Sequence, residues 1–197
     1  MKTFTVTVLI LVFAVAANAQ TLNVAETSGK GKVGVFVSTN ELFIKDFATA
    51  NYSFVYGVYG LTNRVDLYGG VSATTVVGQT QTQLGGGANV NIVKTKFVRL
   101  SDYFILSMPI TRRVDSCDLT VFNSVIVSKT LGKVTPYLGW SATIPLGNTA
   151  DKLFSGPSTV YNVPVGIMIP KGKLAYFAEY NFGQTVRTVG FGVSFAP

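Results

Sequence analysis

Two pairs of polar side chains are the residues of this sequence best suited to chemistry. Glu179 and Asn181 lie two positions apart in an otherwise apolar stretch, and Asp66 and Tyr68 have the same spacing. In an extended chain, residues two apart point to the same face, so each pair places a carboxylate beside a second hydrogen-bonding group. Such a carboxylate can attract a cation or hold a ligand. It can also serve the structure, by pairing with a cation such as Lys32 or by hydrogen bonding to Tyr and Asn side chains, and we favour this structural role.

The side chain on which much enzymatic chemistry depends is missing. The 197-residue chain has no His, which is the usual general base near neutral pH and the commonest metal ligand. Its single Cys, Cys117, can form no disulfide within the chain and is expected to be an incidental loop residue, although pairing between chains stays open. Gly85-Gly86-Gly87 lacks the spacing and the following helix of a nucleotide-binding loop, so we expect a flexible hairpin tip. We therefore predict no enzymatic activity, no cofactor and no metal site.

The N-terminus has the pattern of an export signal. An apolar run at residues 8–17 follows a Lys and ends in an Ala-Asn-Ala tripeptide, so residues 1–19 are expected to form a cleaved signal peptide. The run has about half the length that a membrane-spanning helix needs. Residues 20–29 are expected to form a periplasmic tail, and residues 30–197 the folded domain.

Strict alternation of apolar residues with small and polar ones dominates the C-terminal part of the chain. Between residues 174 and 182 an apolar side chain falls on every second position, with Glu179 and Asn181 among the intervening residues. Residues 189–195 repeat the pattern with Gly and Ser. Period two predicts strands. Because the second face carries Gly, Ser, Asn and a carboxylate, we expect the apolar face to point outward into lipid and the polar pairs to face a lumen.

The same pattern along the chain predicts an all-β fold, an antiparallel up-and-down transmembrane β-barrel of about ten strands, with eight or twelve as alternatives. The strands are expected near residues 33–38, 52–58, 65–77, 88–96, 103–112, 119–129, 134–144, 160–169, 174–182 and 189–195. In the second of them, Tyr52, Phe54, Tyr56 and Val58 form the apolar face. Short turns are expected at 61–64, 97–102, 130–133 and 170–173, and the mostly longer outer loops at 39–50, 78–87, 113–118 and 145–158. An even number of strands brings both termini to one end, as in outer-membrane barrels.

Basic residues gather at the expected short turns, which carry a strong excess of Lys and Arg over Asp, whereas the outer loops are balanced. Lys94 and Lys96 would face lipid if the strand register continued, so we expect them at the membrane interface; a β-bulge near Val93 that turns them inward is the alternative. The rim is predicted to contact anionic headgroups, so reversing the charges of Lys171 and Lys173 should weaken binding to anionic vesicles. Solvated turn lysines are the other interpretation, and without an aromatic platform no nucleic-acid binding is expected. The basic rim comprises Lys94, Lys96, Arg99, Lys171 and Lys173.

Two segments resemble the small outer-membrane β-barrel proteins of Gram-negative bacteria. The sequence VGFGVSF at residues 189–195 resembles the C-terminal strand signal that the barrel-assembly machinery reads. The sequence YGLTNRVDL at residues 59–67 is similar to a strand–turn–strand common in such barrels. The resemblance covers residues 30–195. It implies a location in the bacterial outer membrane, contact with outer-membrane lipids and insertion by the assembly machinery, and it implies no particular activity.

These observations lead to one functional hypothesis and one alternative. The hypothesis is a small bacterial outer-membrane barrel, non-enzymatic, with a structural, surface-interaction or narrow porin-like channel role. The alternative is a secreted soluble β-sandwich that acts as a binding module and is extractable without detergent. Apolar faces recur on nearly every expected strand at membrane-crossing length, which favours the barrel. The sequence leaves the solute and the oligomeric state open.

Overall fold

The computed structural model describes residues 27–44, 48–76, 79–110, 119–146, 159–183 and 186–195. The expected signal peptide, residues 20–26 of the expected tail, the expected loop 113–118 with Cys117, and most of the expected loop 145–158 lie outside the described residues. Within the described ranges, no helix is long and apolar enough to cross a membrane, a finding that does not bear on strands. The strands are β1 Val33–Ile44, β2 Ala48–Gly60, β3 Val65–Val76, β4 Gln79–Lys94, β5 Arg99–Pro109, β6 Leu119–Ser128, β7 Thr135–Leu146, β8 Val160–Lys171, β9 Leu174–Gly183 and β10 Val186–Phe195.

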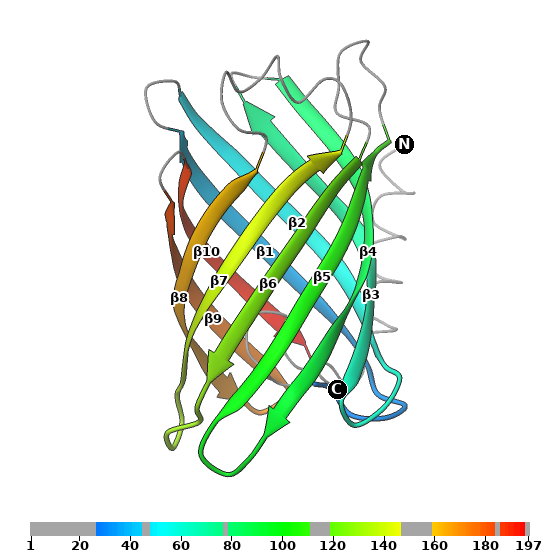
Figure 1. Cartoon of the computed structure of the whole chain (residues 1–197), viewed down its shortest axis with the longest axis vertical. Coiled ribbons are helices and arrows are strands. Elements are labelled where there is room, and N and C mark those ends of the chain that lie inside the picture. The colour runs from blue at the N-terminus through cyan, green and yellow to red at the C-terminus, as the bar shows by residue number, and fades with distance from the viewer. Residues whose placement is uncertain are drawn as a thin grey trace.

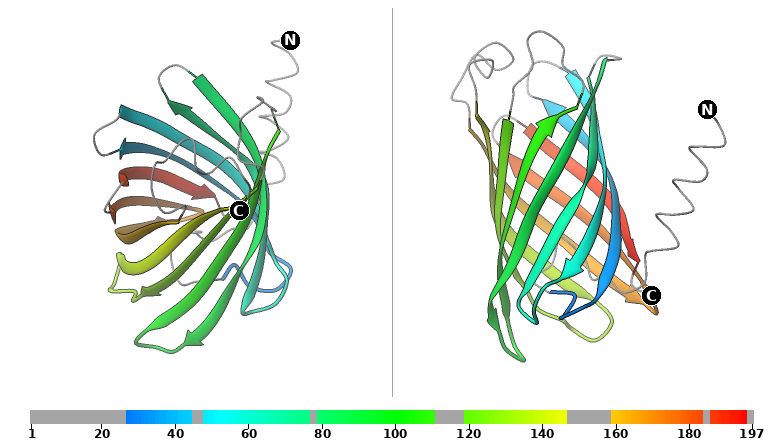
Figure 2. Two further views of the ribbon diagram at one scale, coloured as in Figure 1. Left: turned by 45° about the horizontal axis from the view of Figure 1, so that its top comes forward. Right: turned by 90° about the vertical axis from the view of Figure 1, so that its right-hand side faces the viewer.

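The strands close into one antiparallel barrel. Each strand pairs with its neighbours in the sequence, and β1 pairs with β10 from Val35–Phe195 to Ile44–Val186, so the sheet has no open edge. Figures 1 and 2 show the strands tilted around a common axis, with the C-terminus at the end where the short turns lie. Closure pairs the backbone groups of every strand, which a sheet surrounded by hydrocarbon requires. The predicted fold class, an up-and-down barrel of ten antiparallel strands, is confirmed.

Apolar side chains cover most of the outer wall. On β8, Val163, Val165 and Ile167 point outward and are 38%, 39% and 43% exposed, whereas Met168 between the outward positions is buried in the lumen. On β10, Phe191 is 59% exposed. A belt of exposed apolar side chains around a whole barrel is stable in hydrocarbon but not in water. The predicted arrangement, with the apolar face outward, is confirmed for these strands.

On β2 the predicted orientation is wrong, because the apolar face points into the lumen. Tyr56 and Val58 are 1% and 2% exposed, and the outward positions of β2 include the polar residues Asn51 and Ser53. The physical reason lies in the neighbouring strands. Tyr56 pairs with Gly70 of β3, which in turn pairs with a glycine of β4, so the inner wall has space for a large ring at this position. On the outer wall, Asn51 and Ser53 hydrogen-bond each other, which reduces the cost of facing outward.

Two expected loops are strands. β1 continues to Ile44 and β2 begins at Ala48, so most of the expected loop 39–50 belongs to the barrel wall. The expected loop 78–87 lies almost entirely in β4, and Gly85-Gly86-Gly87 is the middle of a strand rather than a hairpin tip. Ladders with β3 and β5 on both sides hold this stretch extended despite its poor strand propensity. The glycines leave space for lumen rings, since a Cβ at Gly85 would meet the Tyr56 side chain.

Candidate functional site in the lumen

A layer of large side chains crosses the lumen in the half nearest the short turns. Its members lie within a few residues of the strand ends that the short turns connect. Two of them, Phe36 and Phe177, stack with ring centroids 4.8 Å apart. Phe36 is 0% exposed, so its ring is packed on all sides within this layer. We call this set the aromatic layer; it comprises Phe36, Tyr56, Val58, Tyr68, Tyr103, Ile105, Ile126, Tyr137, Met168 and Phe177.

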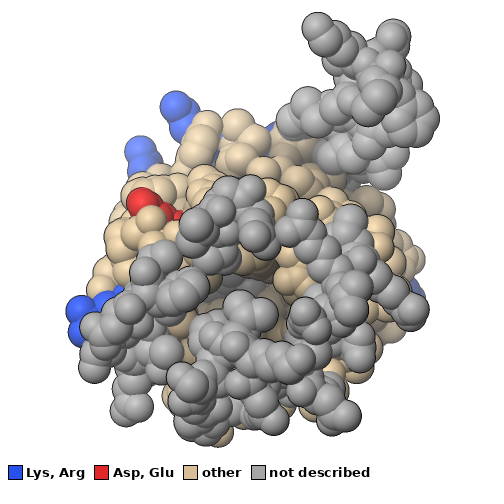
Figure 3. Space-filling view, turned by 90° about the horizontal axis from the view of Figure 1, so that it is seen from above, with Lys and Arg blue, Asp and Glu red and all other residues tan. Residues whose placement is uncertain are grey.

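Hydroxyl and amide side chains line the other half of the lumen, toward the loop end. They occupy inward positions of all ten strands, and all of them except Glu179 are uncharged. Figure 3, seen from the loop end, shows a hollow at the centre of this face, with the described charged side chains at the periphery. Several of the lining residues are only partly buried, so solvent reaches them. We call this set the polar chamber; it comprises Ser38, Asn40, Tyr52, Ser72, Gln83, Ser107, Ser124, Ser141, Asn162, Glu179, Asn181 and Thr188.

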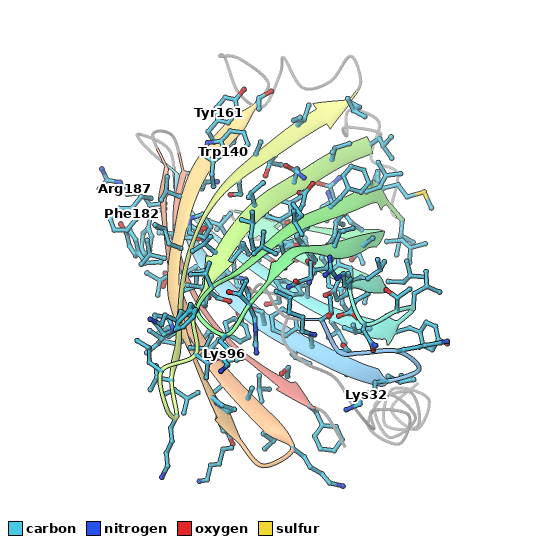
Figure 4. All side chains as sticks on the ribbon, turned by 60° about the horizontal axis from the view of Figure 1, so that its bottom comes forward. Lys32, Lys96, Trp140, Tyr161, Phe182 and Arg187 are labelled. Carbon is cyan, nitrogen blue, oxygen red and sulfur yellow. The ribbon has the colours of Figure 1, made fainter. Side chains whose placement is uncertain are left out.

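Glu179 lies on the inner wall at the junction of the polar chamber and the aromatic layer. Its Oε2 accepts a hydrogen bond of 2.8 Å from the Tyr137 hydroxyl, and its Oε1 accepts one of 2.6 Å from Asn181 Nδ2. Asn181 Nδ2 also donates to Thr188 Oγ1 at 2.7 Å. The carboxylate therefore has Tyr and Asn partners and is held in one position. Lys32 is the cation considered as an alternative partner of Glu179. It lies exposed at the turn end, away from the carboxylate (Figure 4).

Asp66 and Tyr68 lie on the inner wall near the turn end. Asp66 is 0% exposed, and its Oδ2 accepts hydrogen bonds from the backbone N–H of Ser28 at 2.7 Å and from the Ser28 hydroxyl at 3.1 Å. Residues 27–29 of the expected tail therefore fold against the base of the barrel. Tyr68 packs edge-on against Tyr103 in the aromatic layer, with ring centroids 5.2 Å apart. The structure does not bring Asp66 and Glu179 into one site, because each carboxylate has its own partners.

Sequence reasoning missed Ser28, Tyr137 and most of the polar chamber. Ser28 lies outside every strand, and its partner Asp66 is 38 residues away, so no local pattern joins them. Tyr137 alternates with apolar residues on β7, a pattern that places it on the inner face but does not indicate its partner. The signal that pointed to the chamber is the recurrence of Ser, Asn and Thr at every second residue of the strands.

The basic rim lies at the turn end, and its residues are exposed except Arg99, which is partly buried. The register between β4 and β5 shifts between Asn91 and Val93. The β-bulge near Val93, the alternative interpretation of the sequence, is therefore present. After the shift Lys94 pairs with Arg99, and cross-strand partners share a face, so Lys94 lies on the inner side of the rim. Lys96 lies in the turn beyond the end of β4 (Figure 4). Contact of the rim with headgroups stays a prediction.

Comparison with known proteins identifies a class of fold rather than a family. No protein-family model matches the chain, and no curated protein matches its sequence. The translocator domain of the autotransporter NalP from Neisseria meningitidis matches with a TM-score of 0.50 and 12% identity, over 86% of this chain and 89% of that chain. KdgM porin matches with a TM-score of 0.45 and 8% identity, over 82% of this chain and 99% of that chain.

The chain therefore has the fold of bacterial outer-membrane β-barrels. The NalP likeness concerns the fold alone, and the closed ten-strand sheet and the apolar outer wall agree with it. These observations support the predicted outer-membrane location, and they do not favour the alternative of a soluble β-sandwich, whose two sheets would hide their apolar faces in a shared interior. Membrane lipid is accordingly the environment of the outer wall.

Proposed function

We propose that this protein is a small porin-like barrel that admits small solutes into its lumen from the loop end and restricts their passage at the aromatic layer. The observation that carries the proposal is the asymmetry of the lumen. The polar chamber is partly exposed to solvent, whereas Phe36, Tyr56 and Val58 in the aromatic layer are at most 2% exposed. A barrel that served only as a structural element would not need a partly exposed half lined almost entirely by uncharged hydrogen-bonding groups.

We propose further that the role is non-enzymatic. Two carboxylates face the described lumen, and general acid–base catalysis would require at least one of them to reach a reacting group. The partners of the Glu179 carboxylate, Tyr137 and Asn181, supply no second carboxylate or base, and the Asp66 carboxylate is buried beneath Ser28. Among the described residues there is also no group of three or more Asp, Glu or Cys side chains that could hold a metal ion. These arrangements support passage or binding of a solute rather than its conversion.

Single-channel recording in planar bilayers tests the role of the aromatic layer. The wild-type protein should be closed for most of the recording, because closely packed rings occupy the lumen at the layer. Replacing the stacked pair, Phe36→Ala with Phe177→Ala, removes two rings from the layer and should raise the conductance several-fold. Phe191→Ala, which removes a ring of the same size from the lipid-facing side of β10, is the matched control and should leave the conductance unchanged.

The migration of each variant on unheated gels shows whether the barrel has folded, so a failure to fold is recognised before recording. A folded double variant with the wild-type conductance would contradict the proposed constriction. A wild-type protein with a steady, large open current would contradict it as well.

A further inference from the structure

We infer that the polar chamber is a binding site for an uncharged saccharide. The inference deepens the proposed function and rests on it, because it takes the loop-side half of the lumen as the part that receives a solute. A saccharide presents hydroxyl groups around its edge and C–H groups on its ring faces. It is therefore recognised by neutral donors and acceptors together with an aromatic surface.

The first argument is that hydroxyl groups on the β2–β5 side of the chamber are buried without well-formed hydrogen bonds. The Tyr56 hydroxyl lies near Ser72 and Ser107, but neither it nor Ser72 Oγ makes a hydrogen bond of good geometry, although both residues are at most 2% exposed. The Tyr56 hydroxyl and Ser107 Oγ lie beside each other over Gly85, at 2.5 and 3.0 Å from the position that a Cβ would take there. Buried polar groups with poorly formed hydrogen bonds are unfavourable, and ligand hydroxyls at this place would supply better ones.

The second argument concerns the opposite wall, where Glu179 offers a fixed acceptor. An ionised carboxylate has about four lone-pair sites, and the donors from Tyr137 and Asn181 occupy two of them. The remaining sites can accept hydrogen bonds from ligand hydroxyls. The same negative charge disfavours an acidic saccharide, and within the described part of the chamber no Lys or Arg offsets it. A single carboxylate with neutral neighbours is also too little for a hard cation, which takes six or more oxygen ligands.

The third argument is the ring surface on β2, beside the hydroxyl groups. The rings of Tyr52 and Phe54 lie on the inner face of β2 with centroids 5.5 Å apart, and both are only partly buried. Phe54 continues this surface to Phe36 of the aromatic layer, with centroids 5.1 Å apart. A sugar ring can lie with its C–H face against these rings while its hydroxyls reach the walls. Hydroxyl cluster, fixed acceptor and ring surface together match the chemistry of a neutral saccharide.

Isothermal titration calorimetry tests the inference. The full chain, purified from membranes in a detergent without a sugar headgroup, is titrated with a neutral glucose trisaccharide and, separately, with an acidic trisaccharide of the same length. The neutral trisaccharide should bind and the acidic one should bind more weakly. Tyr56→Phe deletes one hydroxyl and should reduce affinity for the neutral trisaccharide by roughly three- to tenfold, the effect of losing one neutral hydrogen bond.

Tyr59→Phe is the matched control, since it deletes the same atom from the same strand at an outward position that is 46% exposed. It should leave the affinity unchanged, and heat-modifiable gel migration confirms that both variants are folded. The inference is overturned if the neutral trisaccharide does not bind, if the acidic one binds better, or if Tyr56→Phe binds as tightly as the wild type.

The calorimetric experiment tests the saccharide site and the electrical experiment tests the constriction, so either proposal can be refuted without the other. Binding that depends on Tyr56, with no change of conductance in the Phe36→Ala and Phe177→Ala variant, would support the saccharide site and remove the constriction from the proposed function. A conductance that rises in that variant, without any binding of the neutral trisaccharide, would retain the channel and overturn the inference.

Discussion

Asn123 shows how a polar side chain is accommodated on the lipid-facing wall of this barrel. It shares the outer face of β6 with Val125 and Val127, and the sequence alone offers no reason for it. In the structure its Nδ2 donates to Asp102 Oδ1 at 2.7 Å and to the Tyr103 carbonyl at 3.3 Å. Polar groups on a wall that faces hydrocarbon are costly unless they satisfy each other. The sequence could place Asn123 on this face but not its partner, because the register between β5 and β6 brings Asp102 there.

At this scale we predict that Asn123→Val destabilises the barrel although it makes the outer wall more apolar. The substitution leaves the Asp102 carboxylate without its donor, which should lower the free energy of unfolding by about 1–3 kcal/mol. Adding Asp102→Val should restore most of the loss, because the pair is then replaced as a unit. Urea titration of the folded protein in lipid vesicles measures both effects. Equal stability of Asn123→Val and the wild type would show that the hydrogen bond contributes nothing.

At the scale of elements, the sequence predicted where most strands lie but not how far all of them extend. Alternation of large apolar and small residues marks β7 to β10 clearly, and these strands agree with the expectation to within a few residues. The first half of β4 is predicted as a loop because Gln, Thr and Gly are typical of loops. β2 was recognised, but alternation shows only which residues share a face and not which face is inside. The lumen side is decided by the glycines opposite Tyr56, and their position depends on register.

The glycines of β4 give a second prediction. Gly85 points toward the Tyr56 side chain, so Gly85→Ala forces the ring or the strand to move and should lower the free energy of unfolding by about 1–3 kcal/mol. The neighbouring residue Gly86 lies on the other face, where a Cβ would make only an ordinary contact of 3.5 Å with the Tyr68 carbonyl oxygen. Gly86→Ala should therefore be close to neutral. The same urea titration compares the two variants, and equal losses would refute the assignment of Gly85 to ring packing.

At the scale of the whole molecule, the apolar exterior and the closure of the sheet make one consistent structure. A barrel without edges needs no partner strand, and its outer wall needs hydrocarbon rather than water. Both properties could be predicted from the sequence, because an even number of alternating strands with short turns at one end allows few other arrangements. The contents of the lumen could not be predicted. Whether rings such as Phe36 and Phe177 fill it depends on side chains from strands far apart in the sequence.

Fractionation of cells that express the full chain, followed by gels run with and without heating, tests the membrane barrel most directly. The account predicts that the protein sediments with membranes, requires detergent for extraction, and migrates faster when the sample is not heated, because a closed barrel resists the denaturing detergent. Recovery of a monodisperse protein in buffer without detergent, with the same migration before and after heating, would contradict it.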